Sequence, residues 1–274
     1  MDLSNDLEYM EKFLSRYKGG EITLLKDHWD DGIAMICINH QEKRNAISGK
    51  MLTDLNKCVR ELESWVDGKA VLIFSKGVNF CSGGDLDFAR KENNPTAGFY
   101  MSYYMHDILK RFRKLPLVSV TLVHGVTVGG GAEISVFSDF ILLADDAKLG
   151  FVHGKMGIMT AWGGATRLIQ IVGQRKALEI LLSSKMYNPE ECLELGFVYK
   201  IVKTDNRMEE ALEFIKSLTT IDSSITRSYK AVANVAVEEN FNTRLELERN
   251  EFYPKWGSDL NKEALRKGIK HVKK

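Results

Sequence analysis

The chain has 274 residues, of which 44% are hydrophobic and 27% are charged, and it contains only four prolines. Its 38 lysines and arginines nearly balance its 37 aspartates and glutamates, which gives a formal net charge of +1. This length suits one large domain, or a domain with an appendage. The balanced charge argues against a general binder of polyanions, so we expect no nucleic-acid partner.

We expect no targeting or membrane-spanning segment in this sequence. No stretch approaches 18 consecutive apolar residues, and segment 1–18 mixes acidic and basic residues without an apolar signal-peptide core. The cysteines Cys37, Cys58, Cys81 and Cys192 are scattered and match no zinc-ligand spacing. We therefore expect no membrane association, no metal, and a reducing compartment, with the cytosol as the default and a removed transit peptide as the open alternative.

Periodicity along the chain predicts an α/β fold. Apolar residues of 3–17 recur at helical spacing until Gly19 and Gly20 end the pattern, and further on β-like runs alternate with helical patterns. The expected strands are 22–25, 33–38, 70–75, 117–123, 140–144 and 198–202, and the expected helices are 49–65, 97–115, 132–138 and 165–183. From Arg207 onward only helical patterns continue, at 208–218, 223–237, 241–253 and 261–270. We therefore divide the chain into a docking helix at 1–20, an α/β core at 21–203 and a C-terminal helical subdomain at 204–274.

Two glycine-rich segments, 80–86 and 129–133, each follow a β-like run and each open a helix-like stretch. Glycine lets the backbone approach a ligand closely, and a helix N-terminus presents unpaired N–H groups. Two such turns that face each other would form an oxyanion hole, which favours an enolate over a neutral thioester. The first turn also fits an ordinary helix start capped by Asp85, whereas three consecutive glycines at 129–131 favour a close ligand or backbone approach.

Glu133 and His153 are the candidate acid–base residues. Glu133 follows the second glycine turn, where it either complements the helix dipole or points into the site. Asp139 lies six residues further on and does not share its helical face, so the two carboxylates do not form an acid–base pair. A lone histidine such as His153 is more often structural than catalytic, and no histidine in the chain has a partner pattern that predicts a metal site.

These segments, together with 43–46 and 163–168, resemble the crotonase (enoyl-CoA hydratase/isomerase) superfamily in order and spacing over about residues 20–270. The resemblance implies a crotonase-like ββα spiral core with a C-terminal helical trimerisation region, a homotrimer or homohexamer, and an acyl-CoA substrate with no separate cofactor. It places Gly84 and Gly130 at the oxyanion-hole positions. The residues that it implies for substrate binding are Lys43, Arg44, Ala46, Ser82, Asp85, Leu86, Asp87, Gly129, Trp162, Lys262 and Lys267.

One departure from the family pattern bears on the chemistry. Two-carboxylate hydratases of this family carry one glutamate at the position of Glu133 and a second where this chain has His153, so the water-activating pair is broken. Segment 151–158, followed by 162–164, is similar to the branch of the family that decarboxylates alkylmalonyl-CoA thioesters. That similarity implies conversion of ethylmalonyl-CoA to butyryl-CoA, and of methylmalonyl-CoA to propionyl-CoA.

A physical argument supports decarboxylation. The carboxylate of a malonyl thioester would be repelled by a second glutamate, whereas a histidine can donate a hydrogen bond and turn it perpendicular to the thioester plane. We expect His153 to orient the carboxylate and the amides of Gly84 and Gly130 to stabilise the enolate. The enolate then takes a proton from Glu133, His153 or a held water, and we hypothesise that Glu133 delivers or relays it.

Two alternatives stay open. The first is an enoyl-CoA hydratase or isomerase that uses Glu133 alone. The second is a non-catalytic member that binds acyl-CoA or RNA, although the most basic stretch, 267–274, contains no aromatic residue on which a base could stack.

Overall fold

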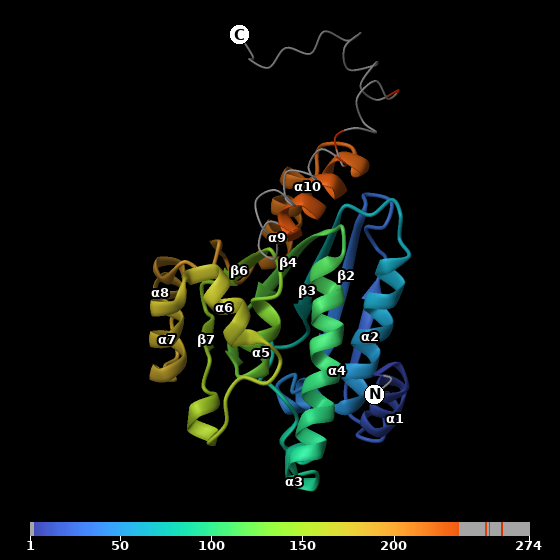
Figure 1. Ribbon diagram of the computed structural model, residues 1–274. Coiled ribbons are helices and arrows are strands. Elements are labelled where there is room, and N and C mark those ends of the chain that lie inside the picture. The colour runs from blue at the N-terminus through green and yellow to red at the C-terminus, as the bar shows by residue number, and fades with distance from the viewer. Residues whose placement is uncertain (1–2, 236–249, 251, 253–258, 260–274) are drawn as a thin grey trace.

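The computed structural model describes residues 3–235, together with Asn250, Phe252 and Asp259 (Figure 1). The expected helix at 261–270 and most of the one at 241–253 lie outside the described residues, as do Lys262 and Lys267.

A six-stranded sheet forms the centre of the fold. Its strands in spatial order are β1 (Glu21–Leu25), β2 (Ile33–Asn39), β3 (Ala70–Ser75), β4 (Val118–Val123), β6 (Phe140–Ala144) and β8 (Lys200–Val202). β1 runs antiparallel to β2, and all the other neighbours are parallel. Strands such as β3 are apolar almost throughout because parallel strands are covered on both faces.

Helices cover both faces of this sheet. The described helices are α1 (Leu3–Leu14), α2 (Gly49–Glu63), α3 (Leu86–Lys91), α4 (Pro95–Lys114), α5 (Gly130–Ser135), α6 (Gly164–Val172), α7 (Gln174–Ser183), α8 (Pro189–Leu195), α9 (Arg207–Leu218) and α10 (Ser223–Val235). One face packs against α2 and α4 in the larger apolar core, and the other packs against α9 in a second, smaller core (Figure 1). Within the described ranges, no helix is both long and apolar enough to cross a bilayer.

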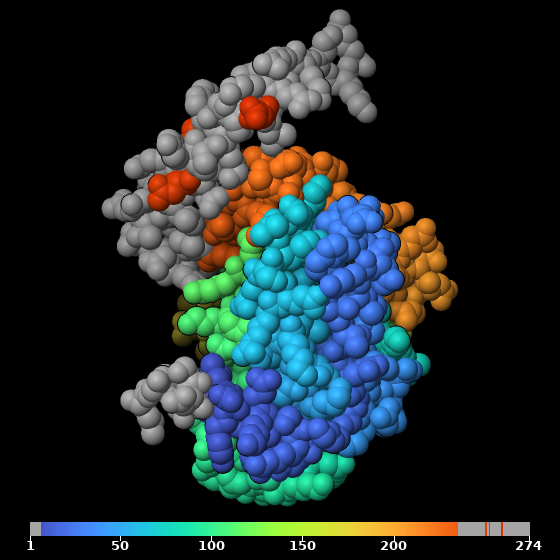
Figure 2. Space-filling model, turned by 90° about the vertical axis from the view of Figure 1, so that its right-hand side faces the viewer, coloured from blue at the N-terminus to red at the C-terminus, as the bar shows by residue number. Residues whose placement is uncertain are grey.

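The expected N-terminal helix is confirmed, although it ends at Leu14 rather than at Tyr17. Met10 and Leu14 are fully buried, and the helix contacts α2 and α4. Figure 2 shows it in dark blue at the end of α2. Phe13 makes edge-to-face contacts with Phe88 of α3 and Tyr100 of α4, so α1 joins the two helices that follow the first glycine turn.

All six expected strands are present, and the α/β class is confirmed. The single helix expected at 165–183 is wrong, because Gly173 has a φ of +79° and separates α6 from α7. The sequence analysis also missed α8 and two short strands, β5 (Val126–Val128) and β7 (Lys148–Gly150), which pair in parallel in a second sheet. Strands of three residues are too short to show a period of two.

Candidate active site

The two glycine turns predicted from the sequence lie in contact. Cys81 and Thr127 form a parallel bridge just before the turns. Gly83 and Gly129 both have positive φ angles, of +97° and +57°, which a residue with a side chain rarely adopts. A Cβ atom on Gly83 would lie only 3.2 Å from the amide nitrogen of Gly130. The glycines are therefore needed for the close approach of the two backbones.

The amides of Gly84 and Gly130 are both unpaired donors among the described residues. Gly84 lies opposite Ile47 in a parallel bridge, but the hydrogen bonds of that bridge are made by Gly83, as acceptor, and by the N–H of Asp85. Gly130 begins α5, where the first N–H groups have no acceptor within the helix. Neither amide donates a hydrogen bond within the part of the chain that the structure describes.

The indole of Trp162 packs against both of these glycines. A Cβ atom on Gly130 would lie 2.1 Å from Cζ3 of Trp162, and one on Gly84 would lie 3.8 Å from Cζ2. Trp162 is only 3% exposed, and its Nε1 faces the sulfur of Met101 in α4. The structure thus brings the three residues together, with the indole beside both glycines, of which Gly130 is buried and Gly84 is exposed.

The carboxylate of Glu133 is buried and fully hydrogen-bonded. Oε2 accepts from the amides of Trp162 at 2.8 Å and Gly164 at 2.9 Å. Oε1 accepts from the amide of Ala161 at 3.2 Å and lies 3.0 Å from Nε2 of His153. Four partners fill the lone-pair positions of a carboxylate. The loop that enters α6 therefore surrounds Glu133 with donors.

His153 uses only one of its two ring nitrogens within the described structure. It begins a short 3-10 helix, η2 (His153–Met156), three residues after the end of β7, and it is 8% exposed. Nε2 faces Glu133, whereas Nδ1 is buried and has no hydrogen-bond partner among the described residues. An unpaired buried nitrogen is costly and rare, so Nδ1 is a natural contact for a ligand.

Lys43 does not offer a free charge to a ligand. Its Nζ lies 2.8 Å from Asp85 and 2.7 Å from Asp87, which raises the pKa of Lys43 and lowers that of Asp87. Asp85 also caps α3 by accepting from the amide of Asp87, so the helix-capping interpretation of this residue is correct. The neighbouring Arg44 is exposed and makes no side-chain ion pair within the described ranges.

Asn45 is a positioning residue that the sequence analysis missed. It is 1% exposed and has a positive φ of 57°. Its side chain accepts from the amide of His40 at 2.6 Å and donates to the carbonyls of Lys76 and Asn79, both at 2.7 Å. Asparagine tolerates the left-handed conformation, so an asparagine directly after Arg44 was the one sign in the sequence of a left-handed residue at this position.

The other predicted binding residues flank the first turn. Ser82 donates from its hydroxyl to the carbonyl of Lys43 at 3.2 Å, and Ala46, three residues after Lys43, is buried. Leu86, at the start of α3, is 49% exposed. Beside the first turn there are therefore an exposed apolar side chain, Leu86, and a lysine, Lys43, whose charge is neutralised by two aspartates.

Cys81 is not a nucleophile despite its place beside the turn. Complete burial raises the pKa of its thiol to about 12, so the reactive thiolate is not populated at neutral pH. The other cysteines are also buried and unpaired. Within the described part of the chain, no cluster of three or more histidines, cysteines or acidic residues could hold a metal ion.

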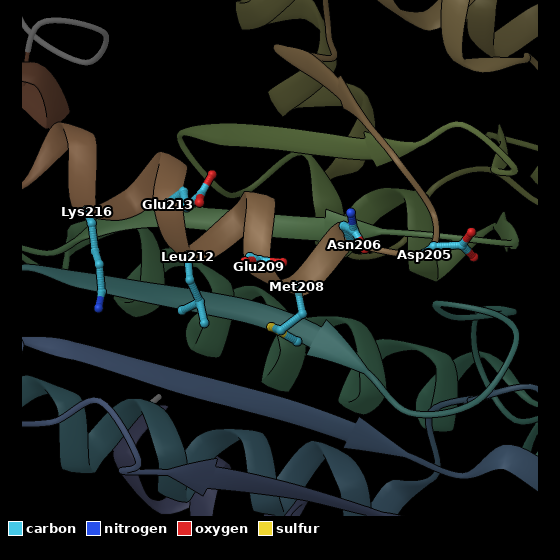
Figure 3. A pocket seen from close by; sticks show the side chains of 7 residues that line it. All are labelled: Asp205, Asn206, Met208, Glu209, Leu212, Glu213 and Lys216. Atoms are coloured by element: carbon cyan, nitrogen blue, oxygen red, sulfur yellow. The ribbon is translucent and has the colours of Figure 1, made fainter.

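A separate surface groove runs along α9, on the other face of the large sheet. Figure 3 shows Met208, Leu212 and Lys216 extending from the same side of this helix. Its remaining lining residues are Asp205, Asn206, Glu209 and Glu213. The groove shares no residue with the glycine turns, and Lys216 pairs with Asp31 at 3.0 Å. The candidate active site is therefore the pair of turns, where His153 lies beside Gly129.

The fold and this pair of turns define a member of the enoyl-CoA hydratase/isomerase, or crotonase, family. The family model matches residues 28–272, and the chain belongs to this family. A Xenopus laevis protein named ethylmalonyl-CoA decarboxylase is 39% identical over 264 residues, which cover 96% of this chain and 88% of the relative. A Xenopus tropicalis protein of the same name is 37% identical over 269 residues, or 97% and 89% of the two chains.

Solved structures confirm the fold. The crystal structure of an enoyl-CoA hydratase from Bacillus anthracis matches with a TM-score of 0.82 and 22% identity, over 89% of this chain and 94% of that chain. The resemblance to the crotonase superfamily and the crotonase-like α/β fold are therefore confirmed.

Proposed function

We propose that this protein decarboxylates ethylmalonyl-CoA to butyryl-CoA. The observation that carries the proposal is a buried histidine, His153, with one unpaired nitrogen, in the same site as the free amides of Gly84 and Gly130. The names of the relatives at 39% and 37% identity support the substrate.

The proposed reaction begins with the substrate carboxylate held by His153. A hydrogen bond turns this carboxylate perpendicular to the thioester plane, so that the breaking C–C bond overlaps the carbonyl π system. The electron pair of that bond moves into the thioester, whose oxygen becomes negative. Amides of Gly84 and Gly130 would each stabilise this oxygen by on the order of 3 kcal/mol in the transition state.

Hydration is less well supported, because Glu133 has no lone pair left to activate water. Its two oxygens already meet the ring of His153 and three amides, including those of Trp162 and Gly164. A hydratase that relied on this residue alone would first have to break one of those hydrogen bonds. RNA binding has no supporting feature in the described residues.

Several finer points belong to the same proposal. Methylmalonyl-CoA is a second substrate, since one methylene changes binding by only about 1–3 kcal/mol. The thioester itself accepts the electron pair, so the reaction needs no cofactor besides the CoA of the substrate. We further propose a homotrimer, or a pair of trimers, built through the C-terminal region 204–274, and a cytosolic location. Lys262 and Lys267 of that region remain candidate contacts for the phosphates of CoA.

The test is a mass-spectrometric assay of the purified protein with ethylmalonyl-CoA, methylmalonyl-CoA and crotonyl-CoA. We expect CO2 and butyryl-CoA from the first, CO2 and propionyl-CoA from the second, and no hydration of the third. The variant His28→Gln, at a partly exposed histidine remote from the turns, is the control for handling and folding. Hydration of crotonyl-CoA without CO2 release from either malonyl thioester would establish the hydratase alternative.

A further inference from the structure

We infer that Nδ1 of His153 both orients the departing carboxylate and then protonates the enolate on the same face, while Glu133 acts only as a positioning residue. The inference rests on the proposed decarboxylation and adds to it the proton donor and the stereochemical course. It differs from our expectation from the sequence, which assigned proton delivery to Glu133.

The first step concerns Glu133. Its oxygens accept from three backbone amides, and it is only 1% exposed. These amides belong to the short loop that enters α6, and a Cβ atom on Gly164 would lie 2.5 Å from Cγ of Glu133. The side chain is therefore fixed on all sides, and neither of its oxygens is open to the α-carbon of a substrate.

The second step concerns the ring of His153. A carboxylate can only accept, so the contact of 3.0 Å between Oε1 of Glu133 and Nε2 requires a proton on Nε2. This contact fixes the orientation of the ring, as carboxylates do for metal-bound and catalytic histidines. Nδ1 is then the ring nitrogen left over, and it is buried without a partner among the described residues, as is Oγ1 of Thr127 just before the second turn.

The third step follows the proton. In the protonated ring, Nε2–H binds Glu133 and Nδ1–H binds the carboxylate of the substrate. Cleavage of the C–C bond releases CO2 and leaves the electron pair on the enolate. The Nδ1–H bond then breaks as a new C–H bond forms at the α-carbon, and the neutral imidazole regains a proton from water before the next cycle.

This sequence predicts retention of configuration, because the donor sits where the carboxylate was. The experiment uses a single enantiomer of ethylmalonyl-CoA that carries deuterium at the α-carbon, with the wild-type protein in ordinary water. The configuration of the 2-deuteriobutyryl-CoA product is the readout. We expect hydrogen to take the place of the carboxylate, whereas inversion or a mixture would overturn the inference.

Two variants assign the proton donor. Glutamine at position 153 can still donate a hydrogen bond but has no proton to transfer, so His153→Gln should release CO2 slowly and give both product configurations. Glu133→Gln should lower kcat about 10- to 100-fold with little change in KM, because it loosens the ring without touching the substrate. Its product should retain configuration. The opposite pattern, with a mixed product from Glu133→Gln and retention in His153→Gln, would identify Glu133 as the donor.

The two proposals fail in different ways. If the wild-type protein releases no CO2 from either malonyl thioester, the proposed function is wrong. If it releases CO2 but the product is inverted or mixed, the decarboxylase remains and only the role of Nδ1 is refuted. Circular dichroism of both variants shows whether either change has simply unfolded the protein.

Discussion

Lys230 of α10 donates a hydrogen bond to Oδ1 of Asp139, which lies just before β6. Asp139 also accepts from the amide and hydroxyl of Ser119, both at 2.8 Å. Burial lowers the pKa of Lys230, and so do the charges of Arg113 and Arg167, whereas Asp139 raises it. One carboxylate thus balances three buried cations where α10 meets the core.

Asp139→Asn should therefore be strongly destabilising. The change leaves Lys230 buried without its counter-charge, and breaking a buried pair in this way costs about 3–5 kcal/mol. Urea denaturation of the wild type and the variant measures the difference. The double variant Asp139→Asn/Lys230→Met should be more stable than Asp139→Asn alone, because it removes the unpaired charge. A loss below about 1 kcal/mol in Asp139→Asn would show that the cations do not depend on this carboxylate.

Alanine should be tolerated at Gly84 and not at Gly130. The Cβ atom of Gly130→Ala would lie 2.1 Å from the rigid ring of Trp162, so we expect a loss of about 1–3 kcal/mol and impaired turnover. In Gly84→Ala the nearest atom of the same ring is 3.8 Å away, which is ordinary contact. Gly84→Ala should stay within about 0.5 kcal/mol of the wild type and keep its amide available.

A double variant identifies the cause of the Gly130→Ala defect. If the clash with Trp162 is responsible, Gly130→Ala/Trp162→Leu should lose less stability than the sum of the two single changes. Thermal unfolding and CO2 release from ethylmalonyl-CoA are the measurements. Strict additivity would mean that the indole is not what Gly130→Ala disturbs.

Asn45 should be sensitive to substitution for two separable reasons. Asn45→Ala loses three side-chain hydrogen bonds. It also places alanine, which has no polar side chain to stabilise the left-handed conformation, at a φ of 57°. We expect a loss of about 2–4 kcal/mol. Asn45→Gly keeps the backbone conformation and should recover about 1 kcal/mol of that loss. Equal stability of the two variants, measured in urea, would assign the whole effect to the hydrogen bonds.

The sequence indicated Glu133 and His153 as candidates but not their contact. They lie 20 residues apart in the chain. The pairing of β5 with β7 brings them together, and the N–H of Gly129 donates to the carbonyl of Gly150 at the end of this pairing. Each of these strands has only three residues. Strands of three residues are too short to show the alternation of apolar and polar residues by which a strand is predicted. The hydrogen bonds from 161, 162 and 164 to Glu133 were equally hidden, because backbone donors leave no trace in residue type.

Ion pairs between distant segments of the chain could not be predicted from the sequence either. Lys43 was expected to contact CoA, but its pairing with Asp85 and Asp87, which lie 42 and 44 residues further on, was not foreseen. α2 and β3 lie between them in the chain, and the bridge between Ile47 and Gly84 shows that the two segments end side by side. In contrast, the long elements, the turns at Gly83–Gly84 and Gly129–Gly130 and the place of Trp162 followed from local patterns and the family resemblance.

Stability in acid should depend on Asp145. Hydrogen bonds from the hydroxyl and amide of Thr204, with the charge of Lys203, lower the pKa of Asp145 from 3.8 to about 2. The unfolded state therefore binds more protons between these values, so this contribution is complete above about pH 4 and is lost as pH falls toward 2. Asp145→Asn should be less stable than the wild type near neutrality, with the gap narrowing below about pH 4.

Denaturation in urea at several pH values measures this gap. Thr204→Val, which removes the hydroxyl but keeps the amide, should give an intermediate acid dependence. A difference between the wild type and Asp145→Asn that stays constant down to about pH 3 would show that Asp145 is not the titrating group.

The neighbouring residues Arg44 and Lys43 should contribute unequally to CoA affinity. Lys43 is already paired with Asp85 and Asp87, whereas Arg44 is exposed and has no ion pair within the described ranges. A charge-assisted contact to a phosphate would be lost in Arg44→Gln, and the KM for ethylmalonyl-CoA should rise about tenfold, equivalent to about 1.4 kcal/mol. Lys43→Gln should leave KM within about twofold, because the lysine has little free charge to offer.

Added salt should weaken CoA binding by the wild type more than CoA binding by Arg44→Gln. A larger effect from Lys43→Gln would mean that CoA displaces the two aspartates, and isothermal titration with free CoA decides between the two cases.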